Sequence, residues 1–429
     1  MSSLLNKITG GRSNLAIELL YGKKPGTLEQ QKHRYIDLVQ KYHRAYPSDG
    51  EIELFSTPGR TEVGGNHTDH NGGRVLAAAL DLDIIAAVAR NAEQIIRVKS
   101  EKFPSVEINT AELEAVPEEQ FTTAALVRGV CARLDQLGYR IGGFDAFTTS
   151  NVPVGAGLSS SAAFEVLIVT ILNHLYNDGG IDDLEIAKIS QYAENVYFGK
   201  PSGLMDQITC ALGGLITIDF QDFDQPIVQK VSFDFETQAY SVVIVDTGGD
   251  HADLTEDYSA VQSEMKSIAR TMGGEVLSEF SKDKLIANLP SIRGQVSDRA
   301  ILRAIHFYDD DQRVVDQVIA LEQGDFKEFL KLVNESGDSS WRLAQNIYTC
   351  RDVHDQRLGV ALALSEIILI DEGAWRVHGG GFAGTIQAFV QDDLVEEYIS
   401  GMESVFGPGS CHRALIRPIG TTRVDQLIR

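Results

Sequence analysis

The spacing of apolar residues predicts helices and strands over most of the chain. Apolar positions recur at helical spacing in residues 3–22 and 28–46, and Gly10 and Gly11 interrupt the first of these segments. We therefore expect a helical N-terminal extension over residues 1–48. Alternating or continuous apolar runs instead predict strands at 51–56, 75–89, 95–100, 144–148, 213–220 and 241–245.

The second half of the chain alternates predicted helices with short predicted strands. Helical spacing recurs at 122–137, 182–198, 255–272, 299–321, 326–335 and 357–369, and strands are expected at 375–378 and 385–391. A polar, Asp-rich segment at 221–236 marks a domain boundary. A chain of 429 residues is long enough for two domains. We expect an α+β protein with domains at 49–230 and 231–429.

A glycine-rich turn at 151–163 joins a predicted strand to a predicted helix. Gly155 and Gly157 lack a Cβ, so a phosphate could come close to the backbone. The serines at 159–161 fall at the helix cap and first turn, where N–H groups and the helix dipole favour an anion. The turn lacks the lysine of a Walker A loop and the third glycine of a dinucleotide loop. A phosphate cradle and an ordinary serine-capped helix both remain compatible with it.

Residues 57–73 are expected to be a loop, because five glycines and one proline occur among them. The loop is dense in side chains that donate or accept hydrogen bonds: Arg60, Glu62, His67, Asp69 and His70. Binding sites concentrate on such loops. The two histidines and the aspartate are too close together for one helical face, so a metal site is not favoured. A sugar-like or phosphate-like ligand matches the loop better, and an exposed polar turn is the alternative.

Three further features each have a plain and a functional interpretation. Glu194 lies near the end of a predicted helix and is either a solvated side chain or a metal ligand. Asp206 follows the turn at 201–203 and is either a partner of the helix dipole or a carboxylate directed into a cleft. The glycine-rich turn at 379–384 lies between two strands. It is either a tight hairpin or a backbone surface close to a ligand or to the other domain.

The net charge and the first residues of the chain indicate which partners to expect and in which cellular compartment the protein works. The formal net charge of −23 argues against general affinity for nucleic acid or for an anionic membrane. The first residues lack the charged and apolar regions of a signal peptide, and no apolar run is long enough to span a bilayer. The four cysteines are scattered along the chain and are expected to be reduced. These features predict a cytoplasmic protein.

Three segments, taken together, resemble the family of small-molecule kinases that includes galactokinase, homoserine kinase, mevalonate kinase and phosphomevalonate kinase. Residues 153–162 (PVGAGLSSSA) resemble the phosphate loop of this family. Residues 58–73 (PGRTEVGGNHTDHNGG) resemble the galactokinase signature, and 379–384 resemble the third, C-terminal motif. Residues 203–207 are similar to the segment with the family's catalytic aspartate, and 251–258 to one ending in a sugar-contacting tyrosine. The resemblance covers about residues 50 to 390.

The resemblance implies the fold and the reaction. It implies a two-domain α+β fold of the GHMP kinase type, with a ribosomal protein S5 domain 2-like N-terminal domain and a ferredoxin-like C-terminal domain. The active site would lie between them. The implied reaction is ATP-dependent and Mg²⁺-dependent phosphorylation of the anomeric C1 hydroxyl of galactose. The partners would be the sugar and ATP, and the protein would be a monomer or a weak homo-oligomer.

The resemblance also implies roles for matching residues. Asp206 would be the base, or the anion that polarises the hydroxyl, and Arg60 would favour its ionised form and stabilise transferred charge. Ser161 and Glu194 would hold Mg²⁺. The residues expected to meet the sugar are Asn66, His67, Asp69, Gly203 and Tyr258. Those expected to meet the nucleotide phosphates are Gly155, Ala156, Gly157, Leu158, Ser159, Ser160 and Ser161, and Ser100 is expected to approach the nucleotide.

Two of the departures of this signature from the galactokinase pattern are opposite in character. The pattern has an asparagine two residues after the arginine, where this chain has Glu62. It has an acid directly before the histidine, where this chain has Asn66. Because that acid contacts sugar hydroxyls in the family, another hexose, an amino sugar or a pentose stays open as the acceptor. A catalytically silent galactose sensor on the same fold is a third hypothesis.

Overall fold

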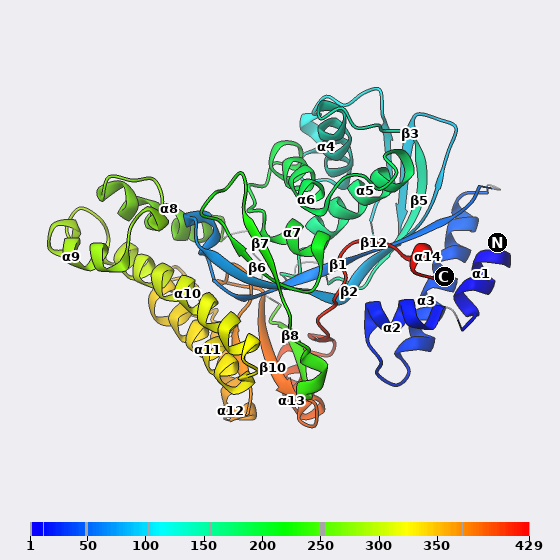
Figure 1. Cartoon of the computed structure of the whole chain (residues 1–429). Helices are drawn as coiled ribbons and strands as arrows, with labels where there is room; N and C mark the ends of the chain where they lie inside the picture. The colour runs from blue at the N-terminus through cyan, green and yellow to red at the C-terminus, as the bar shows by residue number, and fades with distance from the viewer. Residues whose placement is uncertain are drawn as a thin grey trace.

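The computed structural model contains two β-sheets with helices packed against both (Figure 1). It describes residues 2–11, 13–47, 50–101, 103–153, 157–248, 254–370 and 372–428. The α-helices are α1 (Ser2–Thr9), α2 (Ser13–Tyr21), α3 (Thr27–Ala45), α4 (Thr123–Gln136), α5 (Ser160–Tyr176), α6 (Asp183–Tyr192), α7 (Met205–Leu212), α8 (Thr255–Thr271), α9 (Lys282–Ile292), α10 (Asp298–Glu322), α11 (Phe326–Ser339), α12 (Arg357–Leu369), α13 (Val395–Phe406) and α14 (Val424–Leu427).

The strands are β1 (Glu53–Gly64), β2 (Arg74–Arg90), β3 (Ile95–Ser100), β4 (Val106–Asn109), β5 (Phe144–Ser150), β6 (Leu215–Asp219), β7 (Ile227–Val231), β8 (Tyr240–Asp246), β9 (Ala374–Val377), β10 (Thr385–Gln391), β11 (Cys411–Ala414) and β12 (Thr422–Arg423). Short helical turns of other types are η1 (Asp69–Asn71), η2 (Pro117–Glu119), η3 (Ala193–Phe198), η4 (Phe235–Gln238), η5 (Leu277–Glu279) and η6 (Ser340–Ala344). None of the described helices is both long and apolar enough to cross a membrane.

The first sheet has the order β12-β1-β2-β5-β3-β4, and β6 and β7 continue it beside β2. Successive side chains of a strand point to opposite faces, and β2 is apolar on both. Residues 84, 86 and 88 belong to the core beneath α4, α5, α6 and α7, whereas 85, 87 and 89 belong to the core shared with α1, α2 and α3. Figure 1 shows these two groups of helices on different sides of the sheet. The N-terminal extension is therefore a packed layer of the protein.

The second sheet has the order β11-β8-β10-β9, and all its pairs are antiparallel. On β10, residues 386, 388 and 390 pack against α12 and α13. Gln387 points to the other face, where its amide donates to the carbonyl of Glu62 on β1 over 2.8 Å. The second sheet thus meets the first one along β1.

Most predicted elements are present, and α12 has the bounds that the sequence predicts. The expected loop at 57–73 is wrong over residues 57–64, because β1 continues to Gly64. The β1–β2 register shifts between Pro58 and Arg60, and again between Glu62 and Gly64. Proline and glycine are tolerated in strands at such irregularities. Only residues 65–73 leave the sheet, and we call them the sugar loop.

The segment between the sheets is not wholly irregular. β7 lies inside the polar stretch at 221–236 and pairs with β6, so the first sheet ends at Val231 and the second begins at Tyr240. Near the C-terminus the chain returns to the first sheet, where β12 pairs with β1. The predicted helix at 182–198 ends as an α-helix at Tyr192 and continues as a π-helical turn that contains Glu194.

Candidate active site

A bidentate ion pair joins the first strand to the first turn of α7. Arg60 Nε donates to Asp206 Oδ1 over 2.6 Å, and Nη2 donates to Oδ2 over 2.8 Å. Arg60 Nη1 donates to the carbonyl of Gly157, and Ser159 Oγ donates to Asp206 Oδ2. The pair therefore connects β1, α7 and the phosphate loop. The structure brings together both predicted catalytic residues.

This pair sets the charge of the aspartate. Burial by itself would raise the pKa of Asp206, but the charge and hydrogen bonds of Arg60, together with Ser159, hold that pKa below its usual value. The side chain of Arg60 is 7% exposed and that of Asp206 is 23% exposed. Asp206 is thus an ionised carboxylate that a small molecule can still reach.

The sugar loop brings a second carboxylate to this place. An added Cβ on Gly203 would lie 2.6 Å from Asp69 Oδ2, so Gly203 and Asp69 are in direct contact. Burial raises the pKa of Asp69, and the nearby charge of Asp206 acts in the same direction. The structure therefore brings Asp69 close to both Gly203 and Asp206, as the sequence predicts.

His67 and Tyr258 both contact the glycine turn, residues 379–384, which joins β9 to β10 in the second sheet. His67 Nε2 lies 2.8 Å from the carbonyl of Gly380. The ring of Tyr258 lies directly against Gly380, since an added Cβ there would come 1.8 Å from Tyr258 Cε1. The glycine turn is thus in contact with the sugar loop and with α8, and its functional interpretation gains support. His251, in the segment leading to Tyr258, lies outside the described residues.

His67 is neutral and engaged on both nitrogens. Burial and the neighbouring His70 lower the pKa of His67 to about 3. A carbonyl only accepts, so His67 Nε2 carries the hydrogen toward Gly380, and Nδ1 accepts from His70 Nε2 over 3.2 Å. His70 Nδ1 accepts in turn from Asn71 over 3.1 Å. The described partners thus occupy both His67 nitrogens.

The phosphate loop is described from Gly157 onward, and the expected Gly155 and Ala156 lie outside the described residues. Gly157 and Ser159 have φ values of 66° and 55°, a left-handed conformation. The carbonyl of Leu158 accepts from Arg60 N over 3.3 Å. Ser159 is the cap of α5, and its hydroxyl donates to Asp206 instead of capping the helix. The loop is therefore tied to the ion pair at three points.

Ser161 and Glu194 face each other, as the predicted Mg²⁺ ligands require. Ser161 Oγ donates to Glu194 Oε1 over 2.9 Å, and Gln207 Nε2 donates to Glu194 Oε2 over 2.8 Å. Lys200 Nζ lies 3.2 Å from Glu194 Oε1. Among the described residues there is no group of three or more His, Cys, Asp or Glu able to hold a metal. One hydroxyl and one carboxylate suit a cation that takes most of its ligands from phosphates and water.

A largely apolar cavity of about 490 Å³ lies next to the start of α5. Ser160, Ser161 and Phe164 contribute to its wall, and so does Ser100 at the end of β3. Phe198 closes another side. The cavity adjoins the phosphate loop and has the apolar character that a nucleotide base requires. Ser100, which the sequence predicts to approach the nucleotide, thus lines the same cavity as Ser160 and Ser161.

The sequence prediction missed His378, which lies between the phosphate loop and β9. It is 2% exposed, and its Nδ1 lies 2.9 Å from Thr385 Oγ1. An added Cβ on Gly157 would come 2.9 Å from the same nitrogen, so the ring packs on the phosphate loop. Its Nε2 is buried and has no hydrogen-bond partner in the described structure. The signal was its place directly before the glycine turn.

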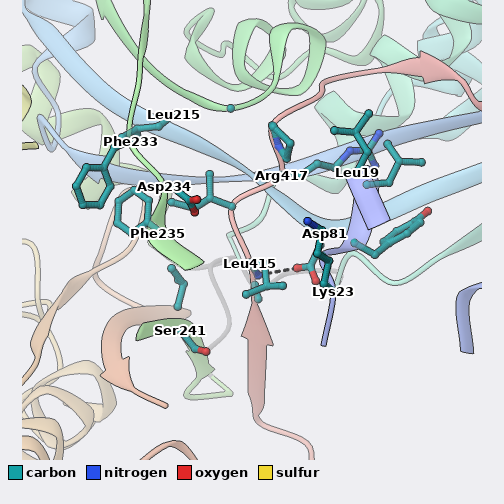
Figure 2. A pocket seen from close by; sticks show the side chains of 18 of the residues that line it. Leu19, Lys23, Asp81, Leu215, Phe233, Asp234, Phe235, Ser241, Leu415 and Arg417 are labelled. Atoms are coloured by element: carbon teal, nitrogen blue, oxygen red, sulfur yellow. Dashed lines mark hydrogen bonds between the residues drawn. The ribbon is translucent and has the colours of Figure 1, made fainter. Parts of the chain in front are cut away.

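A larger cavity, about 720 Å³, lies away from this site. Figure 2 shows Asp81 in its wall, with Oδ1 accepting from the backbone N–H of Leu415 over 2.8 Å. Arg417 lines the cavity too, and its guanidinium donates to Ser56 and to carbonyls of its own segment. Much of the remaining wall is apolar, with Leu19 and Phe233 among its residues. The cavity shares none of the predicted site residues.

The fold and the phosphate loop define a class of protein. The model of the GHMP kinases N terminal domain matches residues 125–214. A solved mevalonate kinase is 18% identical, with a TM-score of 0.60 over 84% of this chain and 98% of that one, and so shares the fold. The chain therefore has the GHMP kinase fold that its motifs predict.

Other comparisons define the family within this class. The galactokinase galactose-binding signature matches residues 40–90. The galactokinase of Streptomyces coelicolor is 31% identical over 372 residues, which cover 86% of this chain and 92% of that protein. That of Clostridium tetani is 28% identical over 376 residues, covering 85% and 91%. The Lactococcus lactis galactokinase, solved with galactose, is 25% identical with a TM-score of 0.78, covering 91% of this chain and all of that one. The chain belongs to the galactokinase family of sugar kinases.

Proposed function

We propose that this protein transfers the γ-phosphoryl group of ATP to the anomeric C1 hydroxyl of galactose, giving galactose 1-phosphate and ADP. The observation that carries the proposal is the placement of Asp206. Its ionised carboxylate is held by Arg60, touches Ser159 of the phosphate loop and lies beside Asp69 of the sugar loop. A base needs this position, between the acceptor and the donor phosphate.

The transfer needs few covalent contributions from the protein. Asp206 accepts the proton of the C1 hydroxyl as that oxygen bonds to the γ-phosphorus, and the bond from the phosphorus to the ADP oxygen breaks. Arg60 keeps Asp206 ionised and oriented, and its charge stabilises the transferring group. Asp69 and Tyr258 orient the sugar hydroxyls. Phosphoryl transfer depends mainly on such positioning and charge stabilisation.

The remaining residues hold the nucleotide and its metal. The phosphate loop from Gly155 to Ser161 binds the phosphates, and the base enters the 490 Å³ cavity beside Ser100. Ser161 and Glu194 would hold Mg²⁺, whose positive charge would stabilise the negative charge of the phosphates. Gln207 orients the Glu194 carboxylate through its 2.8 Å hydrogen bond. Lys200 adds a positive charge close to the phosphates.

The test is ATP consumption by the purified protein with Mg²⁺ against galactose, glucose, N-acetylgalactosamine and arabinose, with the product identified by phosphorus NMR. Asp206→Asn is the inactive control. Asp145→Asn is its matched control, because Asp145 also pairs with an arginine, Arg97, but lies on β5 away from the site. Galactose as the best acceptor, with Asp206→Asn inactive, supports the proposal. If another sugar is the best acceptor, that sugar replaces galactose in the proposed reaction. Thermal stabilisation by galactose without turnover indicates a sensor.

A further inference from the structure

The side chain of Asn66 is wholly buried and already makes all the hydrogen bonds that it can make. Its Nδ2 donates to Glu62 Oε1 over 3.0 Å and to the carbonyl of Gly379 over 2.7 Å. Its Oδ1 accepts from Asn346 Nδ2 over 2.8 Å and from Ser340 Oγ over 3.2 Å. An amide has two donor hydrogens and two acceptor lone pairs, and all four are used. A sugar hydroxyl could bind Asn66 only by displacing one of these partners.

The backbone of Asn66 is held from the second domain as well. Its N–H donates to Asp310 Oδ2 over 2.7 Å, and its carbonyl lies 2.9 Å from His306 Nε2. Both partners lie on α10 and are wholly buried. Burial by itself would raise the pKa of Asp310, but His306 and the arginines Arg376 and Arg313 hold it below its usual value. The backbone of Asn66 is thus held by the ionised carboxylate of Asp310.

Glu62 is the one partner of Asn66 that comes from β1. Its Oε1 also accepts from Arg376 Nη2 on β9 over 2.6 Å, and Arg376 is wholly buried. Burial raises the pKa of the Glu62 carboxyl to about 7, against the charge of Arg376 and the hydrogen bond from Asn66. An asparagine at 66 can donate to Glu62 in either protonation state, whereas an ionised acid there only accepts and would raise the pKa of Glu62 further. Glu62 and Asn66 are therefore a matched pair in this chain. The galactokinase pattern has the reverse order of amide and acid at these two positions.

His67 continues the same attachment. It has a φ of 61°, in the left-handed region that costs a non-glycine residue free energy and persists only where the surroundings impose it. The carbonyls of Gly379 and Gly380 accept from Asn66 and His67 in succession. Two neighbouring side chains of the sugar loop are thus fastened to two neighbouring carbonyls of the glycine turn. The His67 nitrogens, like the Asn66 amide, are already occupied.

We infer that Asn66 and His67 are positioning residues that fasten the sugar loop to the glycine turn of the second domain, and that Asp69 is the side chain with which this loop meets the sugar. The inference rests on the proposed sugar kinase function. Among the side chains of the sugar loop, Asp69 is then the one that selects the sugar. Its carboxylate contacts Gly203 and lies near Asp206. The inference also explains how the chain tolerates Asn66 where the family pattern has an acid.

The test compares Asn66→Asp with a double variant that adds Glu62→Gln. The introduced aspartate has the shape of asparagine but, when ionised, cannot donate. It therefore loses the bond to Gly379, and it meets Glu62 as a second acid, which either repels it or must be protonated. We expect KM for the sugar to rise about tenfold or more, with KM for ATP within about twofold of wild type. In the double variant the introduced glutamine amide can donate to the new carboxylate, so most of the loss is expected to be recovered. Asn173→Asp is the matched control, because Asn173 bonds Ile181 in a buried site remote from the loop.

Deoxygenated sugars separate positioning from direct contact. A displaced loop raises KM by the same factor for galactose, 2-deoxygalactose and 6-deoxygalactose. A direct contact raises it only for sugars that carry the contacted hydroxyl, the result expected of Asp69→Asn. A loss confined to one hydroxyl in Asn66→Asp, or no recovery in the double variant, overturns the inference.

Hydrogen exchange gives a readout that does not depend on the acceptor. In Asn66→Asp the backbone amides of 65–73 and 379–384 are expected to exchange faster, with recovery in the double variant and no change in Asn173→Asp. Unchanged exchange in Asn66→Asp overturns the inference. If the wild-type protein phosphorylates no sugar, the proposed function is contradicted. The exchange result then still tests whether Asn66 and His67 fasten the sugar loop to the glycine turn.

Discussion

Arg60 and Asp206 form two parallel hydrogen bonds across the candidate site, with Nε–Oδ1 and Nη2–Oδ2 distances of 2.6 and 2.8 Å. The two residues are 146 positions apart and come from β1 and α7. A register shift between Pro58 and Arg60 precedes the arginine in the strand. Because the guanidinium also holds Gly157, one residue fixes both Asp206 and the glycine-rich turn before α5.

Replacing Asp206 by asparagine keeps the shape of the side chain and removes its charge. The proton acceptor is lost and Arg60 loses its ionic partner, so we expect kcat to fall by about 10³-fold with little change in KM for ATP. Steady-state kinetics with galactose and MgATP measure this. Asp145→Asn, which alters the pair with Arg97, is expected to retain activity. Residual activity within tenfold of wild type would remove Asp206 from the mechanism.

The pH dependence of activity should report the same pair. With Arg60 present, the pKa of Asp206 is below its usual value, so the carboxylate stays ionised from neutral pH well into the acidic range. Arg60→Met removes the charge and hydrogen bonds of Arg60, so burial is opposed only by Ser159 and Lys200, and we expect the pKa of Asp206 to rise. The acidic limb of kcat/KM is therefore expected to move to higher pH in Arg60→Met and to stay in place in Arg97→Met. An acidic limb at the wild-type position would contradict this account of Asp206.

Local pattern predicted much of the fold, and the family resemblance predicted that Arg60, Asp206 and Asp69 lie together. The strand β2 was visible because both of its faces are apolar over residues 75–80 and again over residues 84–89. Residues 57–64 were missed as strand, because proline and glycine are tolerated there only through pairing with β2. Helix α9, which contains Pro290, was not predicted either.

The partners of Asn66 could not be predicted from the sequence. Asp310, Asn346 and Gly379 lie more than 240 positions further along the chain, and no periodicity relates them to residue 66. Burial of an asparagine likewise leaves no local signal. The family pattern pointed to Asn66 as a sugar contact, whereas the fold shows how many internal partners it has.

The magnesium requirement should depend on Glu194. Glu194→Gln keeps the side-chain size and a neutral oxygen but removes the carboxylate charge. We expect the Mg²⁺ concentration for half-maximal activity to rise about tenfold, because only the Ser161 hydroxyl and the phosphates still favour the cation. Titration of activity with Mg²⁺ at fixed ATP measures this. Glu118→Gln, an exposed acid in η2, serves as control. An unchanged titration curve would place the metal elsewhere.

The N-terminal extension should contribute strongly to stability through Arg34. Its Nη1 donates to Asp83 Oδ1 over 2.5 Å, and its Nη2 donates to the Asp83 carbonyl over 3.0 Å. Asp83 is wholly buried, and its carbonyl also accepts from Asn151 at the start of the phosphate loop. Arg34→Met leaves a buried carboxylate short of a partner, so we expect a loss of about 3–5 kcal/mol in the free energy of unfolding.

Urea unfolding measures the effect of Arg34→Met, with Arg140→Met as the control. Arg140 pairs with Asp178 at the surface, where both side chains are more than half exposed, and its loss should cost under about 1 kcal/mol. The pKa of Asp83 is lowered because Arg34 and Arg417 outweigh burial. This stabilisation is therefore present above the pKa of an unfolded aspartate and is lost as the pH falls through the lower folded value. Equal losses in the two variants would contradict the buried role of Arg34.

Replacing Gly380 by alanine should disturb the site, because the added methyl group would collide with the ring of Tyr258. The φ of Gly380 lies outside the left-handed region, so alanine is compatible with the backbone, but the new Cβ would lie 1.8 Å from Tyr258 Cε1. The ring must move, while the Gly380 carbonyl still accepts from His67. We expect Gly380→Ala to raise KM for the sugar about tenfold and to leave KM for ATP nearly unchanged, because Tyr258 is proposed to orient the sugar hydroxyls.

The matched change is Gly359→Ala in α12, where an added Cβ would meet its nearest atoms at 3.4 Å or more, an ordinary contact distance. This variant should keep wild-type kinetics and gain up to about 1 kcal/mol of stability from the helix propensity of alanine. Tyr258→Phe separates the two parts of the tyrosine, since it removes the hydroxyl and leaves the ring in place. If the hydroxyl binds the sugar, Tyr258→Phe raises the sugar KM although the ring has not moved. Wild-type sugar KM in both Gly380→Ala and Tyr258→Phe would exclude Tyr258 from the sugar site.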